Sequence, residues 1–383
     1  MRGYEEQIDS VLQYASGLPL AIVVLGQFLY NRGASEWSSA MVESKKVVNS
    51  MITKVLKKSF DELGGRCKEI FLDMACFFTG KEIKFVAGIL DSIYRYCFNG
   101  FQPYIQVLIE KSLMVVMDQK IQMHSLLQEM GKEVVRHEFP HKPEEWSRLW
   151  DFEDIYGVMQ NDKFTKAKAI VLELEDSQGR KLRVDGLSCM RNLKLLIFRN
   201  VKFSGVLKDL SRELRYISWY QFPFTSLPSR FEPENLKELI LLNSCITSIW
   251  DEETAPAKLI DEWKKFSRLR KMNLSGSKDL IKLPNFLSLP KLERLELEGC
   301  SKLSYLDPSI ASRWRLNFLN LRNCSNLVSI PNALFSLPSL EMLNLAGCSK
   351  FANCLKFHCF DLAELGETES IQQSLPPCKR KKL

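Results

Sequence analysis

The stretch LERLELEGCSKL, Leu292 to Leu303, decides the fold class of this chain because its spacing recurs. Its leucines at 292, 295, 297 and 303, together with Cys300, match the repeat form L-x-x-L-x-L-x-x-C-x-x-L. The same frame starts again at Leu316 and Leu340, and looser copies start at Leu193, Leu214, Leu236 and Leu269. The seven first leucines are 21, 22, 33, 23, 24 and 24 residues apart. So many units in one register predict a repeat protein.

Each unit is expected to form one short strand whose leucines point inward, so that stacked units share one continuous core. The pattern therefore predicts a leucine-rich-repeat solenoid of the α/β horseshoe type over residues 189–355, after a connector and repeat cap over residues 151–188. The 33-residue step contains an insertion of about ten residues near DEETAPAKLIDEWKK, residues 251–265. This insertion is predicted to form a loop.

The residues between the inward leucines are predicted to lie on the concave face, where partners of such repeats usually bind. The mix of charged, amide and aromatic side chains suits a protein surface better than a phosphate backbone. The alternative is that these residues only solvate the strands. The predicted partner-binding residues are Arg270, Lys271, Asn273, Glu293, Arg294, Glu296, Asn317, Phe318 and Asn320.

Three cysteines, at 300, 324 and 348, occupy one repeat position and are expected to stack in a buried ladder. A disulfide or metal site is one interpretation, and buried free thiols acting as small hydrophobic groups are the other. The chain has no CxxC pair and no Cys/His cluster with metal-ligand spacing, which favours free thiols.

Two helical regions precede the repeats. Residues 1–50 are predicted to be helices from a bundle, with Pro19 at a helix start. In residues 51–150, a helix is predicted at Ile70 to Phe78 and a β-hairpin in SLMVVMDQKIQMH, turning at Asp118-Gln119. Helices followed by a two-stranded wing predict a winged-helix domain. The fold class is therefore α+β multidomain, in which a helical bundle remnant and a winged-helix domain are followed by the solenoid.

The segment KIQMHSLLQEMGKEVVRHE, residues 120–138, contains a candidate binding residue, His124. Ser125 and Gln128 form a capping-box pattern, which predicts Ser125 as the helix N-cap. Leu127, Met130 and Val134 are expected to line one face of the helix. His124 would then stand just outside a helix N-terminus, where free amides favour an anion.

Composition restricts the function classes further. The net charge is +7, and Lys379, Arg380, Lys381 and Lys382 supply four of those charges, so the rest of the chain is nearly balanced. A nucleic-acid partner normally requires a more strongly basic surface, so the evidence for such a partner is weak. The N-terminus does not resemble a secretory leader, and the most apolar stretch, 17–30, is short for a membrane span. A reducing, cytoplasmic location is expected. The tail over residues 356–383 is predicted to be disordered; its basic end resembles a nuclear-import signal, and the alternative is a solvated charge run with no such role.

Three segments carry a family resemblance. GLPLAIVVLGQFL, Gly17–Leu29, resembles the GLPL motif of plant nucleotide-binding, leucine-rich-repeat resistance proteins. VLKKSFDELGGRCKEIFLDMACFF resembles the segment that opens their winged-helix subdomain, in the version found with an N-terminal TIR domain. QMHSLLQEMGKEVVR resembles their MHD motif, and the repeats follow in the expected order.

The resemblance implies that residues 1–50 are the C-terminal helices of a nucleotide-binding (NB-ARC) module that exchanges ADP for ATP. It places Pro19, with Gly17 and Leu18 of the same motif, by the adenine, and His124 at the β-phosphate. It also implies that the repeats sense a pathogen effector or a guarded host protein. Relatives carry Asp where this chain has Ser125, which implies altered control of the resting state.

This chain departs from the family pattern in two respects. It contains no GxxxxGK(S/T) phosphate loop, and no TIR segment precedes Met1. We therefore expect weak or no ADP binding, no enzymatic activity, and a regulatory role that includes action beside full-length relatives. The alternative function is a winged-helix nucleic-acid-binding protein with a repeat scaffold. Its recognition helix would be Ser125–Glu138, whose near-neutral charge counts against it.

Overall fold

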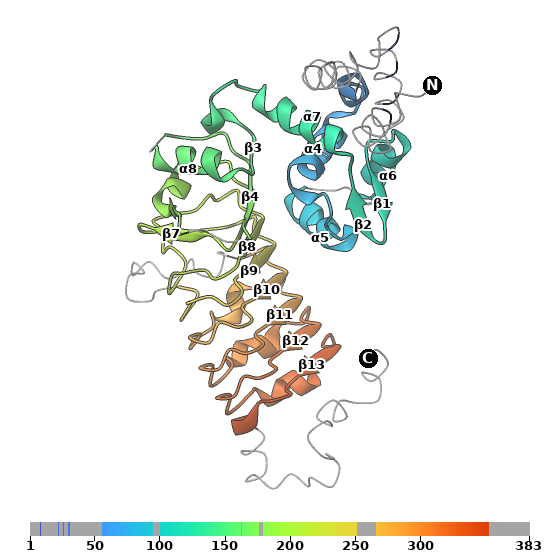
Figure 1. The fold of residues 1–383 in the computed structure, drawn as a ribbon. Helices are drawn as coiled ribbons and strands as arrows, with labels where there is room; N and C mark the ends of the chain where they lie inside the picture. The colour runs from blue at the N-terminus through green and yellow to red at the C-terminus, as the bar shows by residue number, and fades with distance from the viewer. Residues whose placement is uncertain are drawn as a thin grey trace. The chain divides into compact units, whose positions relative to one another are not determined.

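The computed structural model describes residues 56–94, 100–161, 163–175, 179–250 and 266–351, with four isolated positions before them. The chain divides into two compact units, Met1–His141 and Lys142–Leu383 (Figure 1). The predicted helices of residues 1–50, the segment with Gly17, Leu18 and Pro19, the 251–265 insertion and the basic tail lie outside the described residues.

The first unit has the predicted order of helices followed by a wing. Residues 56–61 are helical. They are followed by α4 (Gly65–Asp73), a π-helical turn η1 (Met74–Phe78), α5 (Ile83–Ile93), α6 (Gln102–Glu110), strands β1 (Val115–Met117) and β2 (Lys120–Gln122), and α7 (Ser125–Arg136). The helix predicted to begin at Ile70 begins five residues earlier, because Gly64 leaves the helical conformation and acts as the N-cap.

The wing is a tight antiparallel hairpin. Its register pairs Met117 with Lys120 across the turn. Asp118 and Gln119 both have positive φ, 49° and 61°, which is the conformation of a two-residue type I′ turn. The predicted turn position is therefore confirmed.

Helix α7 packs closely against η1 because Gly131 removes a side chain from the contact. A Cβ at Gly131 would lie 2.5 Å from the Cβ of Ala75. The buried face of α7 consists of Leu127, Met130, Gly131 and Val135. Val134, which was predicted to line this face, is half-buried, and Val135 is buried.

The second unit is built on one long parallel sheet. It contains η2 (Pro143–Glu145), β3 (Arg148–Leu149), α8 (Phe152–Gln160), β4 (Ala169–Glu173), β5 (Lys181–Arg183), η3 (Val184–Cys189), β6 (Leu195–Arg199), β7 (Lys202–Ser204), β8 (Tyr216–Trp219), β9 (Glu238–Ile240), β10 (Lys271–Asn273), η5 (Phe286–Ser288), β11 (Arg294–Glu296), η6 (Pro308–Ser312), β12 (Phe318–Asn320), η7 (Asn332–Ser336) and β13 (Met342–Asn344). The order in the sheet is β13-β12-β11-β10-β9-β8-β6-β4-β3, while β5 pairs separately with β7 (Figure 1).

The repeat register predicted from the leucines is confirmed. All seven first leucines are buried to 1% exposure or less. The middle residues of successive strands also pair in the predicted frame, for example Leu295 with Leu319 and Leu319 with Leu343. The repeating pattern of one inward and two outward residues per strand follows directly from this register.

The sheet starts earlier than the sequence indicated. Strand β3 pairs with β4, so residues 142–150, which the sequence assigned to the winged-helix domain, contribute to the second unit. Strand β4 in turn pairs in register with β6, so the connector 151–188 already contains a strand of the solenoid sheet. Ala167 stands in the first-leucine position of that strand, and a small alanine there hides the repeat pattern.

In each of the seven repeats, the turn after the strand contains a residue in the left-handed conformation. The residue seven positions after each first leucine has positive φ: Asn200 (55°), Gln221 (57°), Asn243 (52°), Gly276 (76°), Gly299 (72°), Asn323 (59°) and Gly347 (75°). Asn and Gly tolerate this conformation best, which explains their recurrence. The sequence reasoning did not use this signal, although it marks each repeat.

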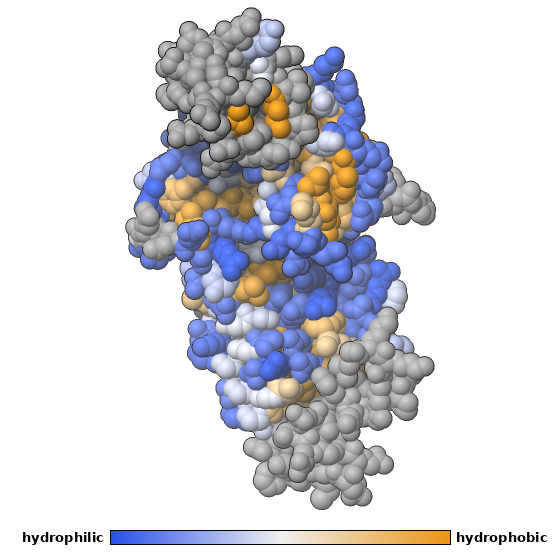
Figure 2. Space-filling model, turned by 45° about the vertical axis from the view of Figure 1, so that its right-hand side comes forward, coloured by the Kyte–Doolittle hydropathy of each residue, from blue (hydrophilic) through white to orange (hydrophobic). Residues whose placement is uncertain are grey.

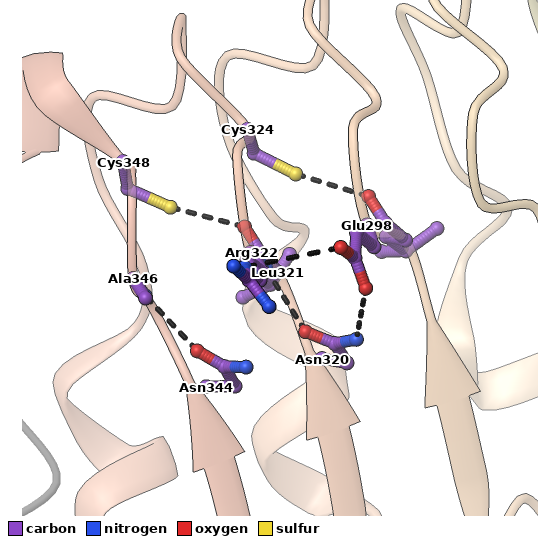
Figure 3. A network of polar contacts seen from close by, with 9 residues as sticks. Glu298, Asn320, Leu321, Arg322, Cys324, Asn344, Ala346 and Cys348 are labelled. Atoms are coloured by element: carbon purple, nitrogen blue, oxygen red, sulfur yellow. Dashed lines mark hydrogen bonds and ion pairs between the residues drawn. The ribbon is translucent and has the colours of Figure 1, made fainter.

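In the last four repeats, the residue that directly follows the left-handed one donates a side-chain hydrogen bond to the preceding repeat, and these bonds form a ladder. Each donor reaches the carbonyl of the leucine that directly follows the strand of the preceding repeat, and Figure 3 shows the bonds of Cys324 and Cys348. The bonds are Ser277 Oγ to Leu241 O (3.3 Å), Cys300 Sγ to Leu274 O (3.3 Å), Cys324 Sγ to Leu297 O (3.1 Å) and Cys348 Sγ to Leu321 O (3.0 Å).

The cysteines of this ladder are buried free thiols, as the simpler interpretation predicted. Burial raises the pKa of the Cys324 thiol to about 12 and also raises that of Cys300 and Cys348. Among the described residues, no group of His, Cys, Asp or Glu could hold a metal ion. Likewise, no helix in the part of the chain that the structure describes is long and apolar enough to cross a membrane.

The ladder predicts different costs for two substitutions at one position. Cys324→Ala leaves the buried Leu297 carbonyl without its donor and should lower the free energy of unfolding by about 1–3 kcal/mol. Cys324→Ser should cost less, because Ser277 already donates to the equivalent carbonyl. Urea unfolding followed by circular dichroism measures both, with the exposed Cys245→Ala as control. Equal losses for Ala and Ser would refute a donor role.

Candidate functional site

The first candidate site is the N-terminus of α7, where His124 lies. His124 itself is the N-cap: its backbone is extended, and its carbonyl accepts from the amides of Leu127 (3.0 Å) and Gln128 (3.1 Å). The prediction of Ser125 as N-cap is therefore wrong by one residue, because Ser125 already has helical conformation. Gln128 does not close a capping box on Ser125 but donates from Nε2 to the Met123 carbonyl at 2.9 Å.

The capping bond also fixes the histidine tautomer. His124 Nδ1 accepts from the Leu126 amide at 3.2 Å. A ring nitrogen that accepts a hydrogen bond carries no proton, so the neutral ring carries its proton on Nε2. Nε2 is thus the ring atom able to donate to an anion. Because the ring is half-buried and held by the helix, the direction of this donor is set by the fold.

Helix α7 does not have the charge distribution of a nucleic-acid recognition helix. Arg136 forms an ion pair with Glu129 on the same helix, with 3.1 Å between Nη1 and Oε1. The apolar side of the helix is buried in the first unit. This arrangement counts against the winged-helix DNA-binding alternative.

The second candidate site is the outward face of strands β10 to β12, which carries the predicted partner-binding residues. In each strand the middle residue is buried and the two flanking residues are half-buried, so Lys271, Asn273, Arg294, Glu296, Phe318 and Asn320 point outward. The strand pairing places Lys271 beside Arg294, and Arg294 beside Phe318. The structure thus brings the predicted residues together on one surface.

The centre of this surface is a preformed stack. The Arg294 guanidinium lies over the Phe318 ring, with 3.4 Å between Cζ and the ring centroid. Its Nε is 2.7 Å from Glu296 Oε1. A cation held between a carboxylate and an aromatic face loses little side-chain entropy when a partner binds. We refer to these three residues as the Arg294 stack.

A second polar group is formed by Glu298, Asn320 and Arg322 (Figure 3). Glu298 accepts from Asn320 Nδ2 at 3.1 Å and pairs with Arg322 Nε at 3.9 Å. Glu298 and Arg322 were missed by the sequence reasoning, which stopped at the fourth residue after each first leucine. Arg270 and Glu293 form a further pair, with 3.8 Å between Nε and Oε1.

Two of the predicted residues also have a structural role. Asn273 and Asn320 accept, through Oδ1, the amide of the residue two positions ahead, at 3.0 Å and 3.1 Å. Asn344 makes the same bond in β13. Such side-chain bonds end the strand and support the left-handed turn that follows. Asn317 directly precedes β12, and its backbone amide donates to the Glu293 carbonyl.

The solvent-facing surface of the repeats is mostly hydrophilic. In Figure 2, blue residues predominate on the visible part of the repeats towards the bottom of the view, and orange residues form small separated areas. A surface of this kind, with Arg and Phe at its centre, resembles the composition of protein interfaces more than that of a small-molecule pocket.

Comparisons with known proteins agree with both units. The family model of the winged-helix domain of Roq1-like disease resistance proteins matches residues 65–139. TMV resistance protein N of Nicotiana glutinosa is 32% identical over 329 residues, covering 86% of this chain and 27% of that protein. Disease resistance protein RUN1 of Vitis rotundifolia is 34% identical over 339 residues, covering 81% of this chain and 24% of that protein.

One further relative and one solved structure complete the comparison. Disease resistance protein RPP2A of Arabidopsis thaliana is 31% identical over 341 residues, covering 86% of this chain and 25% of that protein. The leucine-rich repeat domain of the type III effector XCV3220 (XopL) has a TM-score of 0.32 and 19% identity, covering 58% of this chain and 80% of that chain.

These findings identify both units of the chain and its relatives. Its two units define a winged-helix domain joined to a leucine-rich-repeat solenoid. Over this span the chain is a homologue of the TIR–NB–LRR plant disease resistance proteins. The chain spans about a quarter of the length of the curated relatives it matches.

The cap geometry gives a test that does not require a ligand. His124→Ala removes the Nδ1 acceptor and should speed amide exchange at Leu126 about fivefold, the equivalent of about 1 kcal/mol for a lost N-cap. His124→Asn should restore slow exchange, because Asn caps well. Hydrogen–deuterium exchange resolved by NMR or peptide mass measures the effect, with His137→Ala at the other end of α7 as control. Equally fast exchange in the Ala and Asn variants would rule out capping by residue 124.

Proposed function

We propose that this chain is the winged-helix and leucine-rich segment of an intracellular immune receptor of plants, and that its repeats recognise a pathogen effector or a guarded host protein. The homology to plant disease resistance proteins supports this proposal. The single structural observation that carries it is the Arg294 stack, a preformed Arg–Phe–Glu group on the outward face of the strands. Recognition there regulates an ADP/ATP-dependent signalling switch in defence.

The test is whether partner binding depends on the Arg294 stack. In co-precipitation from infected and healthy plant tissue, Arg294→Ala and Phe318→Ala should each weaken capture of the specific partner about tenfold, as central Arg and aromatic residues of interfaces do. The matched control is Lys302→Ala, which removes an exposed ion pair with Asp279 elsewhere in the repeats. Capture that is unchanged in both stack variants would contradict the proposal.

The nucleotide contact is a proposal of the same kind. His124 Nε2 would donate to the β-phosphate of ADP, supported by the Nδ1 cap that leaves the proton on Nε2. Most phosphate contacts in such switches come from a phosphate loop and its lysine, which this chain lacks. We therefore propose that ADP/ATP binding and any enzymatic activity require segments beyond this chain, including those of full-length relatives, with action in the cytoplasm.

Calorimetry with ADP tests this division of labour. Titration of the purified chain should give no binding, or a Kd of about 1 mM or weaker. The His124→Ala variant should then be indistinguishable from the unmodified chain. A tight isotherm that His124→Ala weakens would show instead that the phosphate site works without the phosphate loop.

A further inference from the structure

One row of side chains on the solenoid has a charge pattern that the predicted partner-binding residues do not include. It consists of the residue that directly precedes each strand. For β4, β6, β8, β9 and β10 these residues are Lys168, Lys194, Arg215, Lys237 and Arg270. We call these five cations the basic row. They come from strands that are far apart in the sequence but adjacent in the sheet.

Backbone hydrogen bonds fix the spacing of the basic row. The amide of each member donates to the carbonyl of the member before it, at 2.7 Å for Lys194, 2.9 Å for Arg215, 2.8 Å for Lys237 and 2.8 Å for Arg270. Neighbouring strands lie about 4.8 Å apart, so the five residues span about 19 Å. Lys168 and Arg270 are exposed, and the other three are half-buried.

The row ends with a change of sign. Continuing along the sheet, the equivalent residues of β11, β12 and β13 are Glu293, Asn317 and Glu341, and the same backbone bonds connect them. Arg270 pairs with Glu293 where the sign changes. This segregation of charge indicates a surface for an anionic partner.

We propose that the basic row binds a short acidic stretch of the protein partner, laid in extended form across strands β4 to β10. The proposal rests on the proposed function and specifies the partner's chemistry. An extended chain places alternate side chains about 6.7 Å apart on one side, so about 19 Å accommodates three or four carboxylates at alternate positions. The Arg294 stack, on the strands that follow, contacts the adjoining part of the partner.

A protein fits this surface better than a nucleic acid. Glu293, Glu296 and Glu298 lie on or beside β11, the strand that follows the row. These carboxylates would repel a phosphate backbone that continued past β10, whereas an acidic stretch of a protein can end there. Whole-chain composition agrees, because 46 acidic residues offset most of the 53 basic ones.

The experiment uses the full chain and a defined probe. The probe is a fluorescent peptide of alternating Glu and Thr, and the comparison ligands are its Lys/Thr counterpart and a single-stranded RNA of similar length. The row variant is Lys194→Gln, Arg215→Gln and Lys237→Gln together. The matched control, Lys278→Gln, Lys291→Gln and Arg315→Gln, removes the same charge and residue types from other exposed sites in the repeats.

The row variant should bind the acidic peptide about tenfold more weakly at low salt, and the control less than about twofold. The Lys/Thr peptide should not bind, and added salt should weaken binding to the unmodified chain. Equal losses in both variants would show unspecific attraction and overturn the proposal. So would row-dependent binding of the RNA without binding of the peptide.

Thermal unfolding separates a binding role from a structural one. The two variants should melt within a few degrees of each other. A loss of melting temperature confined to the row variant would assign these cations to the fold and overturn the proposal. Peptide binding does not involve Arg294 or Phe318, so its outcome is independent of the partner test above. If the row variant binds the acidic peptide as well as the control does, the proposal for the basic row fails but the proposed function stands. If the Arg294 and Phe318 variants capture the partner normally, the proposed function fails but peptide binding by the basic row still stands.

Discussion

The second unit depends on one interaction, the hydrogen bond by which each repeat holds the one before it. Strand amides form the main ladder, and the side chain at the Ser/Cys position adds a second bond to the carbonyl of the preceding strand leucine. A buried carbonyl without a donor is costly, which favours Ser or Cys at this position in the later repeats, whereas Val201 and Phe222 occupy it in the first two. Because both ladders run along the same axis, they set the distance between equivalent side chains of neighbouring repeats on the outward face. The Arg294 stack and the basic row are spaced by the backbone, not by their own contacts.

This rigid spacing affects what the outward face can recognise. Arg294 is held between Glu296 and Phe318 before any partner arrives, and Glu298 is held by Asn320 and Arg322. Interfaces built from preordered side chains lose less conformational entropy on binding. In the first unit the same principle holds for His124, whose capping bond to Leu126 sets both its position and its tautomer. In each unit the candidate contact residue is therefore oriented by hydrogen bonds to the backbone or to neighbouring strands.

The periodic spacing of apolar residues predicted those parts of the structure in which large apolar side chains at regular positions are buried in the core. The leucines predicted the register of β6 and of β8 to β13, and alternation around Asp118-Gln119 located the wing. This spacing did not predict the structure where a small side chain or a backbone hydrogen bond decides it. Ala167 concealed the strand β4, Gly131 was not recognised as part of the buried face of α7, and the helix cap is His124 and not Ser125. The basic row was not recognised from the sequence, since its members are spread over about a hundred residues and become neighbours only in the sheet.

The Ser/Cys ladder has a consequence for redox chemistry. Disulfide exchange and oxidation require an accessible thiolate, and the thiols of Cys300, Cys324 and Cys348 are buried, protonated and bonded to carbonyls. An oxidant that reached the protein would meet the exposed Cys245 before any of them. The outward face of the strands therefore keeps its spacing across a wide range of cellular redox potentials, although three thiols lie in the repeats that form it.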